Sequence, residues 1–589
     1  MAADQPDRPR KPVPRAGVPA PAKPAPKPGA PAQAAAIRPP AGATPRPAVA
    51  TAVRAPTGAT PVRAPTGATP VRAPTGATRP ALRPQAALVA KPAPAKAAPA
   101  PAAAKPAPPA FAKPASAGEG KAAAKPAPAV VPDDARGREA LRLFALGAAL
   151  HRQGRLDDAC RAYGRALLFK PDFPDAYTNL GVALRAQGKS EAAVACHRRA
   201  LGLKSDGANY HSNLGNALRD LGRLAEAAEA LQQALRLAPN APEILYNFGL
   251  VLRDMGRFDT ALSCLEAVLK LQPEHAECRY DRALTLLFAG DLKRGFAEYE
   301  TRWKLRRNPP RKFDKPRWNG QAMPGKTLLL YAEAGFAEAI QFARYAAMAK
   351  KNSGAAIVLE CPPELARLLE TLDAVDRIAI RGAPLPAFDA HIPLLSLPAL
   401  MATTAATVPA DVPYLRAPEI RAIAIPNLVP NAMKVGIAWA GNAEARAERH
   451  RSCPFVHFLE LAQVPGVALY SLQTGDAGRA LGDQAAEPLV YNAGPAIADF
   501  ADLATAINQL DLVISVDTAI AHLAGALAKP VWTLLSTLGD WRYAANGAKS
   551  PWYPSMRLFR QKALGEWPEV MAEVGAALHR AASARKTGR

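Results

Sequence analysis

A repeat of 34 residues constrains this 589-residue chain more than any other feature. Glycine recurs at that interval in two series, Gly147 to Gly249 and Gly154 to Gly290, and a proline closes three of the units at Pro171, Pro239 and Pro273. Small residues let two helices approach closely, glycine fits the turn between them, and proline ends a helix. The spacing predicts an all-α solenoid of about five helical hairpins over residues 139–303.

These residues resemble the tetratricopeptide-repeat pattern, whose stacked hairpins usually hold a peptide or another protein on a concave surface. Asn179, Asn213 and Asn247 recur at the same period on the first helix of their hairpins. An amide offers both a donor and an acceptor to an extended peptide backbone, and a similar asparagine ladder is found in eukaryotic O-linked N-acetylglucosamine transferase. The alternative is that these amides merely cap or solvate their helices. We expect a protein partner on this face.

Residues 1–132 have a composition unlike that of the rest of the chain. They are rich in Pro, Ala, Lys and Arg, they hold most of the formal net charge of +24, and Phe111 is their only aromatic residue. Such a segment buries too little apolar surface to offset chain entropy, so we predict a disordered basic arm. An arm of this kind serves as a spacer or touches polyanions weakly, and it gives no reason to expect a specific nucleic-acid partner.

The first residues and the cysteines bear on the compartment. No apolar segment follows MAADQPDRPRKPVPR, and no run of about 18 apolar residues suggests a membrane span, so we expect a cytoplasmic protein. The six cysteines form no C-x-x-C pair, which predicts reduced core thiols and no metal site.

Alternating strands and helices replace the helical period after residue 303. The predicted strands are 327–333, 355–361, 377–380, 391–395, 434–439, 468–473, 511–517, 530–535 and 556–560. A proline-containing linker near 420–432 divides them into two Rossmann-like α/β halves, residues 304–424 and 433–585. Two such halves across a cleft describe the GT-B architecture of many sugar transferases.

The second half carries the most specific motifs. They are VGIAWAGN, SVDTAIAHLAGAL, DWRY, SPWYP and LFRQ. Together they resemble the C-terminal region of bacterial tetratricopeptide-repeat proteins whose domain is similar to glycosyltransferase family 9, the ADP-heptose lipopolysaccharide heptosyltransferases. The resemblance covers roughly residues 139–585 and implies a nucleotide-sugar site in the second half, with the acceptor side in the first.

The residues of these motifs suit a nucleotide sugar. Unpaired N–H groups at the helix that begins at Thr518 suit a phosphate, Asp517 suits sugar or ribose hydroxyls or caps that helix, and Arg451 or Arg542 suits the departing phosphate. His522 faces either the donor or the core. No D-x-D triplet occurs, so we expect no metal and no cofactor besides the nucleotide sugar. The predicted donor-binding residues are Gly441, Asn442, Arg451, Ser452, Gln473, Asp517, Thr518, His522, Asp540 and Arg542.

The first half departs from the family pattern at one loop. Related proteins carry a GLGD-type loop after the first strand, and its Asp is the expected general base. This chain reads EAGFAEAIQF, with Gly335 kept and with Ala337 and Glu338 in place of the second Gly and the Asp. Glu338 is therefore the predicted base, and Glu333 is a second nearby carboxylate.

Three functions fit these observations. The first is a metal-independent, inverting glycosyltransferase that modifies a protein held by the repeats, with flagellin a candidate acceptor by analogy with repeat-bearing transferases. The second is a non-catalytic adaptor with a degenerate transferase domain, which the altered loop favours. The third is a lipopolysaccharide heptosyltransferase, which leaves the repeats without a purpose.

Overall fold

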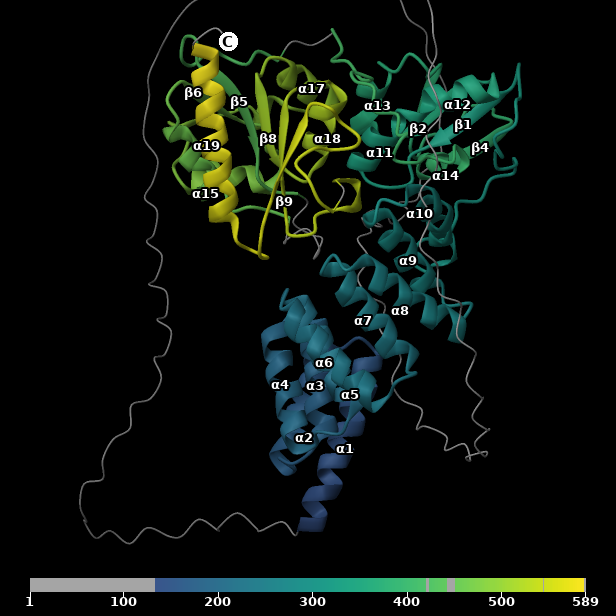
Figure 1. Ribbon diagram of the computed structural model, residues 1–589, viewed down its shortest axis with the longest axis vertical. Helices are drawn as coiled ribbons and strands as arrows, with labels where there is room; N and C mark the ends of the chain where they lie inside the picture. The colour runs from purple at the N-terminus through teal and green to yellow at the C-terminus, as the bar shows by residue number, and fades with distance from the viewer. Residues whose placement is uncertain (1–132, 420–422, 442–450, 544, 587–589) are drawn as a thin grey trace, which may run out of the picture. The chain divides into compact units, whose positions relative to one another are not determined.

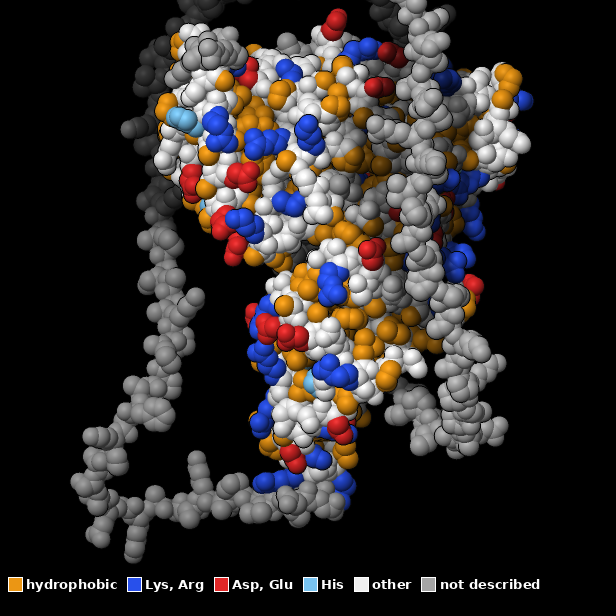
Figure 2. All heavy atoms as spheres, viewed as in Figure 1, with side chains coloured by type: hydrophobic (Ala, Val, Ile, Leu, Met, Phe, Trp, Pro, Cys, Tyr) orange, Lys and Arg blue, Asp and Glu red, His pale blue; other side chains and the backbone are white. Residues whose placement is uncertain are grey.

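A computed structural model describes residues 133–419, 423–441, 451–543 and 545–586 (Figure 1). The predicted arm, residues 1–132, and the predicted donor-binding residue Asn442 lie outside these ranges. Within them, no helix is both long enough and apolar enough to cross a bilayer. Basic and acidic side chains are intermixed over the face in view (Figure 2).

The predicted solenoid is confirmed as five helical hairpins in the described part of the chain. Five glycines, Gly154 to Gly290, form the tight turns inside the hairpins with positive φ angles of 74–83°. A short 3-10 helix, η1 (Glu300–Lys304), follows the last hairpin. The helices are α1 (Asp133–Arg152), α2 (Leu156–Phe169), α3 (Pro174–Ala186), α4 (Ser190–Leu203), α5 (Ala208–Asp220), α6 (Leu224–Leu237), α7 (Pro242–Asp254), α8 (Phe258–Leu271), α9 (Ala276–Phe288) and α10 (Leu292–Tyr299).

The first glycine series lets the two helices of a hairpin touch. A Cβ added at Gly147 would lie 2.7 Å from the Tyr163 ring, and one at Gly181 would lie 2.6 Å from the His197 ring. Leu231 and Leu265 take the place of these rings in the next two hairpins. His197 is buried, and neither of its ring nitrogens has a hydrogen-bond partner. Burial lowers the pKa of His197 from 6.5 to about 4.

Polar contacts at a spacing of 35 residues join the second hairpin to the third and the third to the fourth. Arg185 donates to Asp220 at 2.8 Å, and Arg219 donates to Asp254 at 2.5 Å. The Tyr210 hydroxyl also donates to Asp175, at 2.6 Å. Because one partner lies in each repeat, these bonds fix the stacking of neighbours rather than the fold of any single hairpin.

The first α/β half is a four-stranded parallel sheet in the order β3-β2-β1-β4. Apolar residues 313, 385 and 388, from irregular segments, pack against Leu329, Val358 and Ala379 of the sheet. The strands are β1 (Thr327–Tyr331), β2 (Ala356–Cys361), β3 (Arg377–Ile380) and β4 (Ala390–Pro393), and the helices are α11 (Phe336–Ala343), α12 (Tyr345–Ser353), α13 (Pro363–Leu369) and α14 (Leu397–Leu400).

The second half is a six-stranded parallel sheet in the order β10-β9-β8-β5-β6-β7. Its strands are β5 (Met433–Ala438), β6 (Val467–Ser471), β7 (Val490–Asn492), β8 (Leu512–Val516), β9 (Val531–Leu535) and β10 (Met556–Arg560). Its helices are α15 (Val456–Leu459), α16 (Ala480–Asp483), α17 (Phe500–Asn508), α18 (Ala519–Ala526) and α19 (Trp567–Lys586). The predicted strands all form within one or two residues, and β7 was not predicted. The proposed domain limits themselves stay predictions.

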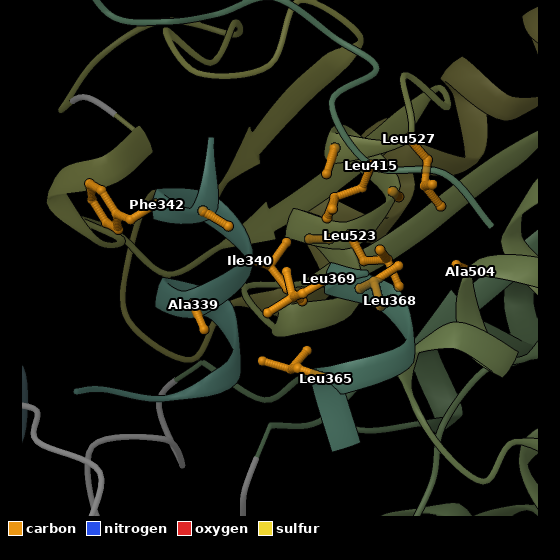
Figure 3. Close-up of a cluster of buried hydrophobic side chains, with 14 of the residues drawn as sticks. Ala339, Ile340, Phe342, Leu365, Leu368, Leu369, Leu415, Ala504, Leu523 and Leu527 are labelled. Atoms are coloured by element: carbon orange, nitrogen blue, oxygen red, sulfur yellow. The ribbon is translucent and has the colours of Figure 1, made fainter. Parts of the chain in front are cut away.

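The two halves share one hydrophobic core. Side chains of α11 and α13 meet those of α17 and α18, as Figure 3 shows for Ile340 and Leu368 beside Leu523. An ion pair from Arg367 to Asp499 at 2.8 Å also connects α13 to the start of α17. The predicted pair of Rossmann-like halves therefore packs as a continuous body at this interface.

A buried ion network connects the end of the solenoid to the first sheet. Arg302 of η1 donates to Glu333, just after β1, at 3.0 Å and to the Ser396 hydroxyl at 2.7 Å. Ser396 in turn donates to Glu300 at 2.7 Å. The Arg302 side chain is 3 % exposed and that of Glu333 is 9 % exposed. Burial raises the pKa of Glu333, and Arg302 opposes that rise.

Candidate functional site

The predicted donor-binding residues gather where the central strands of the second sheet end. Asp517 directly follows β8, and Gly441 lies beyond the end of the neighbouring strand β5. Thr518 caps α18, since its hydroxyl accepts a hydrogen bond from the Ile520 N–H at 3.2 Å. The alternative reading of Asp517 as the helix cap is therefore wrong, and its carboxylate serves other partners. Ligands of open α/β sheets bind at this carboxyl edge.

Asp517 is a buried carboxylate with two neighbours. The Tyr543 hydroxyl donates to Oδ1 at 2.7 Å, and Arg451 Nη1 lies 3.4 Å from Oδ2. Burial raises the pKa of Asp517, while Arg451 opposes the rise and Asp540 adds to it. The carboxylate thus depends on these two groups for its charge, because few solvent contacts remain to stabilise it.

His522 lies in the core rather than facing a donor. Its Nε2 is 3.0 Å from the Tyr543 oxygen and its Nδ1 is 3.1 Å from the Tyr553 oxygen. Burial, followed by the neighbouring Arg542, lowers the pKa of His522 to about 3, so the ring is neutral. Because Tyr543 gives its single hydrogen to Asp517, Nε2–H must donate to Tyr543 and Nδ1 must accept from Tyr553.

Two residues of this chain of hydrogen bonds were not predicted as site residues. Tyr543 and Tyr553 belong to the DWRY and SPWYP motifs, which marked the region but not the role of each residue. Each hydrogen bond in the series is donated toward Asp517. Tyr553 donates to His522, His522 donates to Tyr543, and Tyr543 donates to Asp517. The arrangement holds the Asp517 carboxylate in one orientation.

Arg542 is the centre of a second cluster, formed with one residue of each half. Its Nη1 donates to Asp540 Oδ1 at 2.7 Å, and its Nη2 donates to Glu338 Oε1 at 2.9 Å. The guanidinium carbon lies 4.8 Å from the centre of the Trp541 ring. Burial, the largest influence, disfavours the charged form, yet Asp540 and Glu338 raise the pKa of Arg542 above its usual value. A buried cation of this kind suits an anionic ligand.

The altered loop of the first half is part of a helix. Gly335 caps α11, and Ala337 and Glu338 lie in its first turn. Ala337 does not have a positive φ angle, so its methyl group causes no backbone strain. Glu338 reaches Arg542, whereas Glu333 is bound to Arg302 and to the Leu395 N–H at 3.2 Å. Of the two carboxylates considered as a base, only Glu338 lies at the cluster.

Gln473 does not present its amide to a ligand. Its Oε1 accepts from the N–H groups of Trp439 and Ala440 at 3.1 and 3.0 Å, and its Nε2 donates to the Ala440 oxygen at 3.1 Å. The prediction that Gln473 binds the donor finds no support in this geometry, because the backbone after β5 uses the amide. Gly441 and Ser452 are half-buried on either side of residues 442–450, which are not described.

The asparagine ladder lies on the first helices of three successive hairpins. Asn179 belongs to α3, Asn213 to α5 and Asn247 to α7, and all three side chains are half-buried. None of these amides occupies the Ncap position of its helix. The capping alternative is therefore wrong, and solvation or ligand binding remains.

The acidic, histidine and cysteine side chains of the described residues form no metal-binding group. Among those residues there is no cluster of three or more His, Cys, Asp or Glu side chains that could hold a metal ion. All six cysteines are free thiols, and Cys278, Cys361 and Cys453 are buried. The other three, Cys160, Cys196 and Cys264, are half-buried, so the prediction of core thiols agrees with the burial of only half of them.

Family models match both parts of the chain. Models of the tetratricopeptide repeat match residues 147–188, 215–252, 246–311 and 175–203. The model of glycosyltransferase family 9 (heptosyltransferase) matches residues 495–569. That segment includes Asp517, Thr518, His522, Asp540 and Arg542, and it leaves out Glu338 and Arg451.

One curated protein and several solved structures are similar to this chain. Protein FlbA of Caulobacter vibrioides is 27 % identical over 325 residues, which are 50 % of this chain and 53 % of that protein. The chain thus spans about half the length of this curated relative. The structure of YrrB, a tetratricopeptide-repeat protein, is 23 % identical and covers 29 % of this chain and 88 % of its own, with a TM-score of 0.25. The structure of TTC0263 from Thermus thermophilus is 24 % identical and covers 29 % and 93 %, with a TM-score of 0.27. The chain carries tetratricopeptide repeats and, C-terminal to them, a segment of the glycosyltransferase family 9 type.

Proposed function

We propose that this protein is a glycosyltransferase that moves a sugar from a nucleotide sugar to a protein held by its repeats. The observation that carries the proposal is a pair of arginines, the half-buried Arg451 and the buried Arg542, each beside a carboxylate near the end of β8. The family 9 match over the same strands supports the reaction class.

Each side chain has a role in this reaction. Arg542 and Arg451 neutralise the leaving phosphate, and Asp517 accepts hydrogen bonds from sugar or ribose hydroxyls. The acceptor's Ser or Thr oxygen forms a bond to the anomeric carbon while the bond from that carbon to the phosphate oxygen breaks. Glu338 takes the hydroxyl proton. The arginines do the work that a divalent cation performs in metal-dependent transferases, so no metal is needed.

The repeats supply the acceptor. Asn179, Asn213 and Asn247 form a row of half-buried amides with one amide per repeat. An amide binds the backbone of an extended peptide without reading its side chains, which suits a transferase that recognises a segment rather than one sequence. Flagellin stays a candidate acceptor by analogy.

The test of the donor site uses the full chain. Calorimetric titration with a panel of nucleotide sugars should find a donor whose binding is lost in Asp517→Asn, because the side chain no longer carries the charge held by Arg451. Asp373→Asn is the matched control, since Asp373 is an exposed aspartate that pairs with Arg416 on the surface of the first half. Failure of the chain to bind any donor would contradict the proposal.

The test of the acceptor site uses the best donor and purified flagellin. Intact-mass analysis should show a sugar-sized gain that disappears in Glu338→Ala. The triple variant Asn179→Ala, Asn213→Ala, Asn247→Ala should raise the acceptor KM at least about tenfold with little change in kcat, since each lost hydrogen bond costs about 0.5–1.5 kcal/mol. Asn240→Ala, in an exposed turn between repeats, is the control. An unchanged KM in the triple variant would rule out the ladder.

The second candidate function is a non-catalytic adaptor. The ion pair from Glu338 to Arg542 favours it, because both the proposed base and the proposed phosphate ligand are already neutralised. An adaptor would bind a nucleotide sugar, or a protein partner on the repeats, without any mass gain in the partner.

A further inference from the structure

Among the residues that the structure describes, the Arg542 cluster and the Asp517–Arg451 pair together hold more carboxylates than guanidinium groups. Glu338, Asp540 and Asp517 are three carboxylates, and Arg542 and Arg451 are two guanidinium groups. A donor diphosphate would add further negative charge to this buried site. An anion that binds the terminal nitrogens of Arg542 therefore competes with the carboxylates that they already hold.

Glu338 is the carboxylate that can leave. Its side chain is 22 % exposed, against 14 % for Asp540 and 7 % for Asp517. Asp540 is also tied to Arg542 through the backbone, because the Arg542 N–H donates to Asp540 Oδ1 at 3.0 Å. Glu338 comes from the other half of the fold, through one side-chain contact at 2.9 Å. Rotation of its side chain therefore has a single ion pair to break.

We propose that Glu338 occupies the position on Arg542 that a donor phosphate takes, so that donor binding displaces this carboxylate and frees it to accept the acceptor's proton. The inference rests on the proposed function and adds an order to it. While Glu338 is bound to Arg542, the carboxylate oxygen that faces the guanidinium is engaged in the ion pair and is not available to a hydroxyl proton. A donor that takes over Arg542 frees that oxygen, so the base becomes available only when there is a sugar to transfer.

The ion pair then has a protective use. A base that is free before the donor binds could activate an acceptor hydroxyl, or water, when no sugar is present to be transferred. The exchange predicts that the nucleotide sugar binds before the acceptor and that the acceptor alone does not displace Glu338. It also explains how one arginine can hold a carboxylate of its own chain and still serve a phosphate.

The test compares Glu338→Gln with the unaltered full chain by calorimetry, using ADP, GDP and UDP as probes. Glu338→Gln keeps the size of the side chain and removes the competing charge, so the diphosphate that binds best should bind at least about threefold more tightly. With a transferable donor, the same variant should lose at least about a hundredfold in transfer rate. A purely structural role for Glu338 predicts weaker binding together with slower transfer. Glu364→Gln, an exposed acid in the first turn of α13, is the control and should change neither value.

A second measurement uses the unaltered protein, in case the variant folds poorly. Carbodiimide labelling of carboxylates, read by peptide mass spectrometry, should increase at Glu338 when the best diphosphate is added. Unchanged or weaker nucleotide binding by a folded Glu338→Gln, or unchanged or reduced labelling at Glu338, would overturn the exchange. If the unaltered chain binds nucleotide and transfers sugar but the affinity or labelling results are not as expected, only the exchange at Arg542 is refuted. If the unaltered chain binds no nucleotide, the proposed function is refuted as well.

Discussion

Replacement of Tyr543 by Phe tests whether the buried hydrogen-bond series stabilises the charge of Asp517. The substitution removes the hydroxyl that donates to Asp517 at 2.7 Å and that receives His522 Nε2–H at 3.0 Å. A hydrogen bond to a charged group contributes about 1.5–3 kcal/mol, and a buried donor left without a partner costs about 1–3 kcal/mol. The two losses together should lower the free energy of opening this region by about 3 kcal/mol or more at pH 7.

The sign of the pH dependence follows from Asp517. Burial raises the folded-state pKa of this group, so the stability linked to it is complete below the unfolded-state value and is lost as pH rises through the folded-state value. Loss of the Tyr543 hydrogen bond raises the pKa of Asp517 further. The deficit of Tyr543→Phe should therefore be larger at pH 7 than near pH 4.5, where the carboxyl group is protonated more easily in the folded protein.

Native-state hydrogen exchange, read by mass spectrometry on peptides from β8 and α18, measures this local opening without assuming two-state unfolding of the whole chain. Tyr210→Phe is the matched control, because its hydroxyl donates to Asp175 at 2.6 Å in the solenoid. That control should leave exchange in β8 and α18 unchanged. A deficit below about 1 kcal/mol, or one that is equal at both pH values, would refute the assigned direction of the bonds.

Three further predictions concern other features of the chain. Arg302→Met should lower the free energy of unfolding by about 3–5 kcal/mol, because it leaves Glu333 buried without its cation. A second change, Glu333→Gln, should restore part of this loss, as measured by the midpoint of urea unfolding. An equal loss in the double variant would contradict this account. His197→Leu should stabilise the solenoid by about 1–3 kcal/mol in thermal melts, since it removes two unpartnered ring nitrogens and supplies the residue type found at Leu231. Because the folded pKa of His197 is about 4 against 6.5 for an unperturbed histidine, the unaltered solenoid should lose stability as pH falls from 6.5 through 4, and the variant should lose less. Under the proposed function arginines bind the donor phosphates without a metal, so a chelator should change the nucleotide affinity less than about twofold, and a larger loss would refute metal independence.

The fold could be read from the sequence wherever the signal is local or periodic. The solenoid is built from close contacts within each hairpin that recur along the chain, and a spacing such as Gly181 to Gly215 records this recurrence directly. The buried parallel strands appear as apolar runs, as in β8. β7 was missed because the three residues Val490–Asn492 are too few for any pattern to register.

The site was harder to predict because side-chain direction depends on distant partners. The sequence placed His522 at the right helix but left its direction open, and that direction is set by tyrosines 21 and 31 residues further along the chain. It placed Gln473 at a strand end but could not reveal that the backbone of the adjacent strand uses the amide. Arg302 had no signal at all, since Glu333 and Ser396 lie 31 and 94 residues further along the chain.

The contacts between repeats allow the solenoid to change length in whole units. Arg185, Arg219 and the aspartates they bind, Asp220 and Asp254, all recur at the same interval of 34 residues. If one complete unit were excised, Arg185 would stand at the same distance along the chain from Asp254 as it now does from Asp220. The interface would therefore re-form across the deletion. Duplication or loss of a unit can lengthen or shorten the binding surface without any new interface, so the reach of this protein along a partner is an adjustable quantity.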